Sequence, residues 1–253
     1  MKNILDRSFR WVYESFNLLK LSTRFSLIAG MFYLMFYMFI PASPGLSLLT
    51  PVLIIFWPFI AVYIISYYLS VLNNKPYDFK KMTDSIKGKF SKLIYIGFLY
   101  IFYTILLSVL ISEDVIKINE IAQTSELKAI ETKDLTAIAL KALILTIPFL
   151  MLTWFAPFLV VFNNFDFFKS IKSSFAGCLM FFVPILITWL IFVCIFVGLI
   201  VLITFVISSM NFLGMNFISL FTSFFILFLA IIFISITFIF QAIAFKEIFK
   251  SII

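Results

Sequence analysis

The sequence predicts an all-α, polytopic membrane protein with six transmembrane helices. These are expected to form three hairpins, each preceded by a basic amphipathic interfacial helix. Three observations support this class. The chain is 64% hydrophobic and only 12% charged, whereas soluble domains are about 25% charged. Uncharged apolar stretches long enough to cross a hydrocarbon core about 30 Å thick recur along the chain. One short motif also occurs three times, ahead of each pair of such stretches.

Six apolar stretches are predicted to be membrane-spanning helices, because a backbone in hydrocarbon must satisfy its own hydrogen bonds. They cover residues 25–41, 48–72, 93–112, 137–162, 180–208 and 217–245. A soluble protein could not bury so much apolar surface. Apart from Lys141 near the start of the fourth stretch, the predicted spans contain no Asp, Glu, Lys, Arg or His. Ion-coupled transport is therefore disfavoured.

The repeated motif is a Phe followed by Lys or Arg, with Ser six positions after the Phe and an apolar residue at the seventh. Its copies cover residues 9–16, 79–86 and 168–175. In the second copy Phe79, Met82, Ile86 and Phe90 fall on one face of a helix, and lysines occupy the other. Such a helix is expected to lie in the interface, with its apolar face toward acyl chains and its basic face toward headgroups.

Further markers predict that the whole chain is an internal repeat. The pair Asn73-Asn74 recurs ninety residues later as Asn163-Asn164, and Pro58-Phe59 recurs as Pro148-Phe149. We therefore expect one membrane domain, 1–253, with repeat units of about 4–72, 74–162 and 164–248 and an outer loop at 113–134. The alternative is chance similarity within aromatic-rich membrane sequence.

The first apolar stretch is predicted to be retained rather than cleaved as a signal peptide. The 24 residues before it are patterned as a helix, whereas a signal peptide has a short basic lead. The alternative is cleavage near Pro41-Ala42-Ser43.

The basic residues predict the topology. Fifteen of the 19 Lys and Arg residues lie before span 1, between spans 2 and 3, between spans 4 and 5, or after span 6. By the positive-inside rule these segments, and both termini, are expected in the cytoplasm of a bacterium, with the chain in its inner membrane.

Two groups of residues are candidate sites. The basic faces form a candidate surface for lipids, expected to be anionic, or for a partner; its members are Arg10, Lys80, Lys81, Lys87, Lys169 and Lys172. The alternative is that these helices only fix how each hairpin enters the bilayer. The second group is Pro58, Pro148 and Pro157, which could kink spans 2 and 4 around a cavity. The alternative is that these prolines serve packing alone.

Enzyme signatures are missing from the sequence. Without histidine there is no Ser-His-Asp triad and no imidazole metal site, and no Gly-x-Ser-x-Gly elbow or phosphate-binding glycine loop occurs. We expect no catalytic residue, cofactor or metal. Cys178 and Cys194 are interpreted as apolar packing residues. Nucleic acid is not expected as a partner, because no soluble domain carries the net charge of +7.

The run Trp154-Phe155-Ala156-Pro157, followed by Phe168-Lys169 and Ser174-Phe175, resembles a family of uncharacterised bacterial six-span inner-membrane proteins. The chain is more distantly similar to the membrane domain that accompanies glycerophosphodiester phosphodiesterases. The resemblance implies a six-span fold in the bacterial inner membrane. It implies no chemistry and no functional residue.

Two functions remain open. The first is a non-catalytic membrane protein that organises or modulates lipids or partner membrane proteins, a second copy of the chain included. The second is a permease for lipid or another apolar small molecule.

Overall fold

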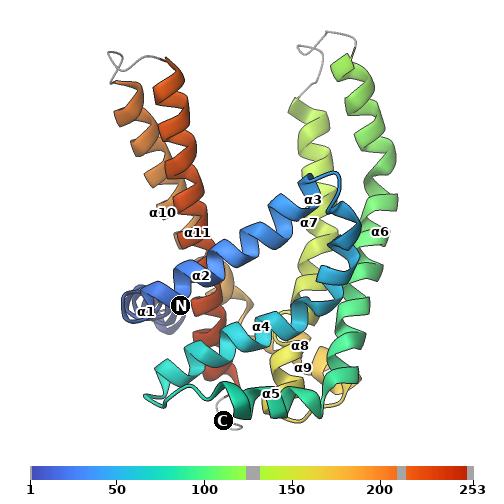
Figure 1. Cartoon of the computed structure of the whole chain (residues 1–253), viewed down its shortest axis with the longest axis vertical. Helices are drawn as coiled ribbons and strands as arrows, with labels where there is room; N and C mark the ends of the chain where they lie inside the picture. Colours follow the sequence, from blue (N-terminus) through green and yellow to red (C-terminus); the bar gives the residue numbers. More distant parts are fainter. Residues whose placement is uncertain (1, 124–131, 210–214, 250–253) are drawn as a thin grey trace. The chain divides into compact units, whose positions relative to one another are not determined.

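The computed structural model describes residues 2–123, 132–209 and 215–249, and over these residues it is helical with no strand (Figure 1). The helices, in chain order, are α1 (Lys2–Leu21), α2 (Thr23–Leu34), α3 (Ile40–Ala42), α4 (Thr50–Leu72), α5 (Phe79–Lys87), α6 (Phe90–Gln123), α7 (Thr132–Thr153), α8 (Ala156–Phe162), α9 (Phe167–Met180), α10 (Phe182–Ser208) and α11 (Met215–Ile248). A π-helical turn, Met35–Phe39, joins α2 to α3, and a short 3-10 turn, Ser47–Leu49, precedes α4.

Six helical stretches are long and apolar enough to cross a membrane, which confirms the predicted class. They are Thr23–Ala42, Ser47–Leu72, Phe90–Ser112, Ile138–Phe162, Phe182–Ile207 and Leu220–Ile248. Their ends differ from the predicted ones by at most three residues. The agreement is close because continuous apolar length alone defines a span.

The chain divides into two compact units. The first, here called the terminal unit, holds Met1–Thr50, Ile60–Asp84 and Met180–Ile253; the second, the middle unit, holds Pro51–Phe59 and Ser85–Leu179. These units do not follow the three predicted repeats, because α1 and α2 pack against helices from the far end of the sequence. The threefold repeat and its hairpins stay predictions.

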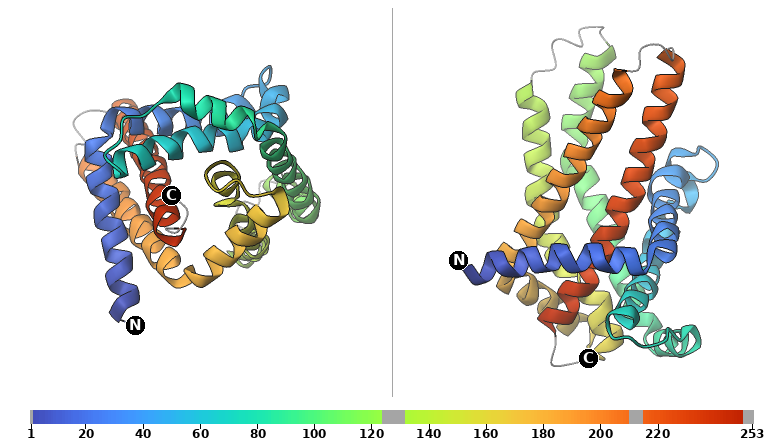
Figure 2. Two further views of the ribbon diagram at one scale, coloured as in Figure 1. Left: turned by 90° about the horizontal axis from the view of Figure 1, so that it is seen from below. Right: turned by 90° about the vertical axis from the view of Figure 1, so that its left-hand side faces the viewer.

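In the terminal unit, α10 and α11 run side by side (Figure 1), and α1 lies across both (Figure 2). The face that α1 buries carries Ser8 and Ser15, with Trp11 and Leu18 beside them, and a third buried serine, Ser22, follows directly after the helix at the same seven-residue spacing. A seven-residue spacing is close to two helical turns, so these side chains share one face. Small side chains on that face let neighbouring backbones approach closely.

The crossing of α2 and α11 depends on a glycine. A Cβ atom added at Gly30 would overlap the backbone carbonyl oxygen of Ile231. Beside this contact, the hydroxyl of Ser235 donates to the carbonyl oxygen of Ser26 at 2.6 Å, and the hydroxyl of Tyr68 donates to the Ser26 hydroxyl at 3.0 Å. Buried polar side chains thus join α2, α4 and α11.

In the middle unit, α6 and α7 run side by side (Figure 1). The hydroxyls of Tyr103 and Thr146 are hydrogen-bonded at 2.6 Å, and the rings of Tyr103 and Phe149 stack with centroids 3.8 Å apart. A second close crossing occurs at Gly97, where a Cβ atom would overlap the backbone of Ile55.

Helix α6 continues past the predicted end of its span. It ends at Gln123, and α7 begins at Thr132, so much of the expected outer loop 113–134 is helical. Asp114 on this extension pairs with Lys141 on α7 at 2.9 Å. Residues 124–131 of the predicted loop lie outside the described residues.

The fourth span is interrupted. Helix α7 ends at Thr153, and α8 begins at Ala156 with Pro157 in its first turn. Proline is suited to that position because its missing N–H is not needed there. By contrast, Pro58 lies inside α4, which continues to Leu72.

The two Asn pairs that were matched in sequence both follow a helix end, and each contains one residue with a left-handed backbone. Asn74 and Asn164 both have left-handed backbones, with φ of 52° and 59°. After α4, the Lys75 N–H donates to the Ser70 carbonyl at 2.9 Å, as in a Schellman motif. Asparagine tolerates this conformation better than most residues.

Candidate functional site

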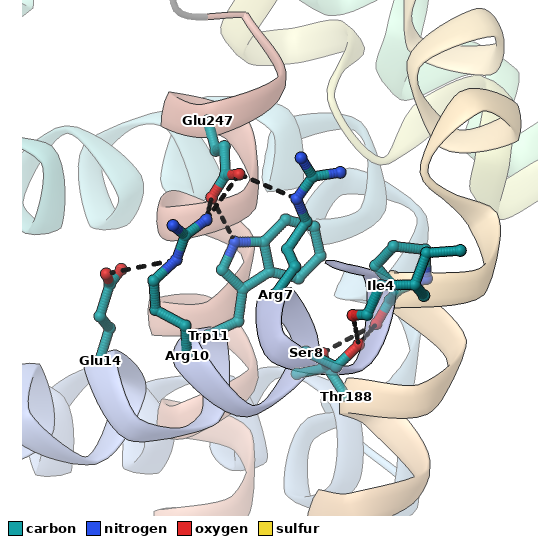
Figure 3. A network of polar contacts seen from close by, with 9 residues as sticks. Ile4, Arg7, Ser8, Arg10, Trp11, Glu14, Thr188 and Glu247 are labelled. Atoms are coloured by element: carbon teal, nitrogen blue, oxygen red, sulfur yellow. Dashed lines mark hydrogen bonds and ion pairs between the residues drawn. The ribbon is translucent and has the colours of Figure 1, made fainter. Parts of the chain in front are cut away.

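Three side chains of α1 converge on one carboxylate near the end of α11 (Figure 3). Arg10 Nη2 donates to both carboxylate oxygens of Glu247, at 2.7 and 2.8 Å, and Trp11 Nε1 donates to Oε2 at 2.7 Å. Arg7 Nε lies 3.0 Å from Oε1. The Glu247 side chain is only 14% exposed, and Trp11 is fully buried. These contacts fix the carboxylate of Glu247 between α1 and α11.

Lys246, the residue before Glu247 in the chain, joins helix α4 to α11. Lys246 Nζ donates to the carbonyl oxygen of Leu72, the last residue of α4, at 3.0 Å. A cation is favourable there because the C-terminal carbonyls of a helix carry partial negative charge. We call Arg7, Arg10, Trp11, Lys246 and Glu247 the terminal clamp, since together they join α1 and α4 to α11.

A second group of charges surrounds the end of α8 in the middle unit. Lys89 Nζ donates to the carbonyl oxygen of Val161 at 2.7 Å. Lys92 Nζ donates to Asp166 Oδ1 at 2.9 Å and to the carbonyl oxygen of Phe165 at 3.4 Å. Burial lowers the pKa of Lys89, and the positive charge of Lys92 lowers that pKa further. The two lysines therefore meet at one helix end, and we call them the lysine pair.

The interruption in the fourth span is supported by a serine from α9. Ser174 Oγ accepts a hydrogen bond from the Phe155 N–H at 3.0 Å and donates to the Met151 carbonyl at 2.9 Å. Ser174 and Phe155 are fully buried. Because hydrocarbon offers no substitute partners, this hydroxyl makes the interruption tolerable. Burial raises the pKa of nearby Cys178 to about 12, so its thiol stays protonated and unreactive near neutral pH.

Replacing Ser174 by alanine is expected to lower the free energy of unfolding by about 1–3 kcal/mol, because it leaves a buried N–H and a buried carbonyl without this partner. The matched control is Ser173→Ala, which removes a half-buried hydroxyl from the same helix. Thermal unfolding in detergent, followed by tryptophan fluorescence, compares the two variants. Equal midpoints for both variants would show that Ser174 does not support the interruption.

The structure places the predicted basic residues in two kinds of surroundings. Five of them are exposed on α5 and α9: Lys80, Lys81, Lys87, Lys169 and Lys172. Arg10 instead belongs to the terminal clamp, with its guanidinium committed to Glu247. The first aromatic residue of each motif is exposed as well, Phe9 by 59%, Phe79 by 64% and Phe168 by 74%.

The three predicted prolines differ from one another. Pro58 is buried inside α4, Pro148 is exposed inside α7, and Pro157 is buried in the first turn of α8. Only Pro157 adjoins an interruption of its span. The cavity between kinked spans stays a prediction.

Sequence reasoning did not list as candidates the residues with the most specific contacts, namely Trp11, Lys89, Lys246 and Glu247, and it gave no contact for Ser174, the serine of the third motif copy. The seven-residue serine spacing of α1 was the available signal for its buried face. Glu247 had no such signal, because its partners lie more than 230 residues away in sequence.

Within the described residues, no group of three or more His, Cys, Asp or Glu side chains could hold a metal ion. Comparisons with protein-family models, with curated proteins and with solved structures find no match. The family resemblance of the 154–178 region therefore stays a prediction.

Proposed function

We propose that this chain is a non-catalytic integral protein of the bacterial inner membrane that organises or modulates lipids, holding anionic headgroups on α5 and α9. The observation that carries the proposal is the exposure of neighbouring aromatic and basic side chains at the start of each helix. Phe79 precedes Lys80, Phe168 precedes Lys169, and all four are exposed.

This arrangement suits the surface of a bilayer. An exposed phenylalanine can enter the acyl boundary while the adjacent ammonium stays at the level of the phosphates. In α9 the face turned to the protein carries the small residues Ser170, Ser174 and Gly177, which leaves Phe168 for the lipid. The excess of Lys and Arg in the same segments supports a cytoplasmic position for them and for both termini.

The test of the proposal is the lipid that co-purifies with the protein. Changing Lys80, Lys81 and Lys87 together to Gln is expected to reduce retained anionic lipid several-fold, because each ammonium near an anionic surface contributes about 1 kcal/mol. The matched control changes Lys117, Lys128 and Lys133 on the predicted outer side to Gln. If the first variant kept all of its anionic lipid and lost a protein partner instead, the basic faces would be a protein-docking surface.

The interruption at Trp154 and Phe155 favours a second candidate, a permease for lipid or another apolar molecule, because discontinuous helices frame substrate sites in transporters. Proteoliposomes containing a fluorescent phospholipid analogue test it. Transbilayer movement above that of protein-free vesicles, lost on Pro157→Ala, would favour the permease.

A further inference from the structure

We infer that the lysine pair and the adjoining face of α6 bind one anionic phospholipid, with its phosphate held by Lys89 and Lys92 and an acyl chain lying along α6. The inference rests on the proposed function, since it assigns one specific lipid site beyond the separate basic faces of α5 and α9.

The lysine pair carries positive charge that its surroundings do not balance. Lys89 has no carboxylate partner among the described residues. Lys92 pairs with the carboxylate of Asp166, but that side chain is 83% exposed. The C-terminal end of α8 adds only about half a negative charge, and Lys169, over the Phe165 ring at 4.2 Å, adds another positive one. A phosphate would offset the remaining excess.

Hydrogen-bond donors also remain at the pair. An ammonium has three N–H donors. Lys89 uses one, on the carbonyl of Val161, and Lys92 uses two, on Asp166 and Phe165. Three donors are therefore left for a phosphate, a group with several strong acceptor oxygens.

An exposed apolar stripe on α6 begins one turn beyond Lys92. Its members, with their exposed fractions, are Tyr95 57%, Phe98 53%, Phe102 64%, Ile105 58% and Val109 65%. Spacings of three and four residues place them on one helix face, and Lys92 lies three residues before the first.

The length of this stripe favours a phospholipid over free phosphate. From Tyr95 to Val109 the helix rises about 21 Å, and one leaflet of hydrocarbon is about 15 Å thick. A chain attached to a phosphate at Lys92 would therefore have apolar contact along its whole length.

Titration of the purified full chain with phosphatidylglycerol in mild detergent, followed by native mass spectrometry, tests the site. Wild type is expected to bind one phosphatidylglycerol tightly, and Lys89→Gln with Lys92→Gln is expected to weaken that binding roughly tenfold or more. The control, Lys20→Gln with Lys75→Gln, removes the same charge from exposed positions outside the proposed lipid surfaces and should keep the tight lipid. Lys89→Arg with Lys92→Arg keeps both positive charges, so it should bind phosphatidylglycerol more tightly than the double Gln variant does.

A variant that is expected to strengthen lipid binding distinguishes loss of the site from misfolding of the double Gln variant. Asp166→Asn removes the exposed negative charge that competes with a phosphate for Lys92, so it should leave the unfolding midpoint unchanged and tighten phosphatidylglycerol binding about threefold. Unchanged binding in both Asp166→Asn and the double Gln variant would overturn the site. Displacement by a moderate excess of inorganic phosphate would assign it to free phosphate instead. If wild type preferred no anionic lipid over phosphatidylcholine, the proposed function itself would fail.

Discussion

Replacement of Gly30 by alanine is expected to prevent stable folding of the terminal unit. The added Cβ would overlap the backbone carbonyl oxygen of Ile231, and a carbonyl within α11 can move only if the helix moves. Overpacking of side chains typically costs about 1–3 kcal/mol, and overlap with backbone should cost more. Alanine gains about 1 kcal/mol of helix propensity over glycine, which is too little to compensate. The measurement is the yield of monodisperse protein from size-exclusion chromatography, together with its unfolding midpoint.

The control for this prediction is Gly198→Ala in α10, where an added Cβ would meet nothing within 4 Å. That variant should express as well as wild type and unfold at an equal or higher temperature, since only helix propensity changes. If Gly30→Ala gave the same yield and unfolding midpoint as Gly198→Ala, α2 and α11 would not cross as closely as described.

Replacement of Glu247 by alanine is expected to release α1 from α11 and to lower the free energy of unfolding by about 2–4 kcal/mol. The buried Trp11 indole N–H would lose its acceptor, and two guanidiniums would lose their shared carboxylate. Hydrogen bonds to charged groups contribute about 1.5–3 kcal/mol each. The arginines add less than this, because Arg7 and Arg10 are 37% and 50% exposed and can turn to water.

Hydrogen exchange of α1 measures the release directly, because amides of a detached helix exchange faster. Glu247→Gln keeps one acceptor for Trp11, so the amides of α1 should exchange in this variant at rates between those of Glu247→Ala and wild type. The control is Glu14→Ala, whose side chain is 42% exposed and lies 3.9 Å from Arg10; its effect should be a few tenths of a kcal/mol. Unchanged exchange in Glu247→Ala would mean that α1 is held by its serine face alone.

The spans were predictable because apolar length determines them without reference to neighbours. The buried faces of α1 and α9 were not. Their apolar residues, such as Phe9 and Phe168, were expected to face acyl chains and are exposed, but the sequence did not show that Ser15 and Ser174 would be fully buried on the other side. Inside a membrane, lipid is as apolar as leucine, so helices gain by close contact through small residues rather than by burying large ones.

The interruption of the fourth span and the terminal clamp show a second limit of sequence reasoning. Pro58 and Pro157 were both predicted to kink a span, but only Pro157 borders a break, where Ser174 satisfies the backbone from another helix. Likewise, the pairing of Glu247 with Arg10 joins residues 237 positions apart in the chain. Both features depend on contacts between distant segments, which local pattern does not encode.

The most direct test of the central claim, that the chain holds anionic lipid, is native mass spectrometry of the wild-type protein extracted from its own membrane in mild detergent. The expected result is retained phospholipid that is enriched in anionic headgroups relative to the membrane extract, and high salt should reduce it, because exposed charges are screened over about 8–10 Å. Retained lipid in the same proportions as the membrane, unaffected by salt, would contradict the claim.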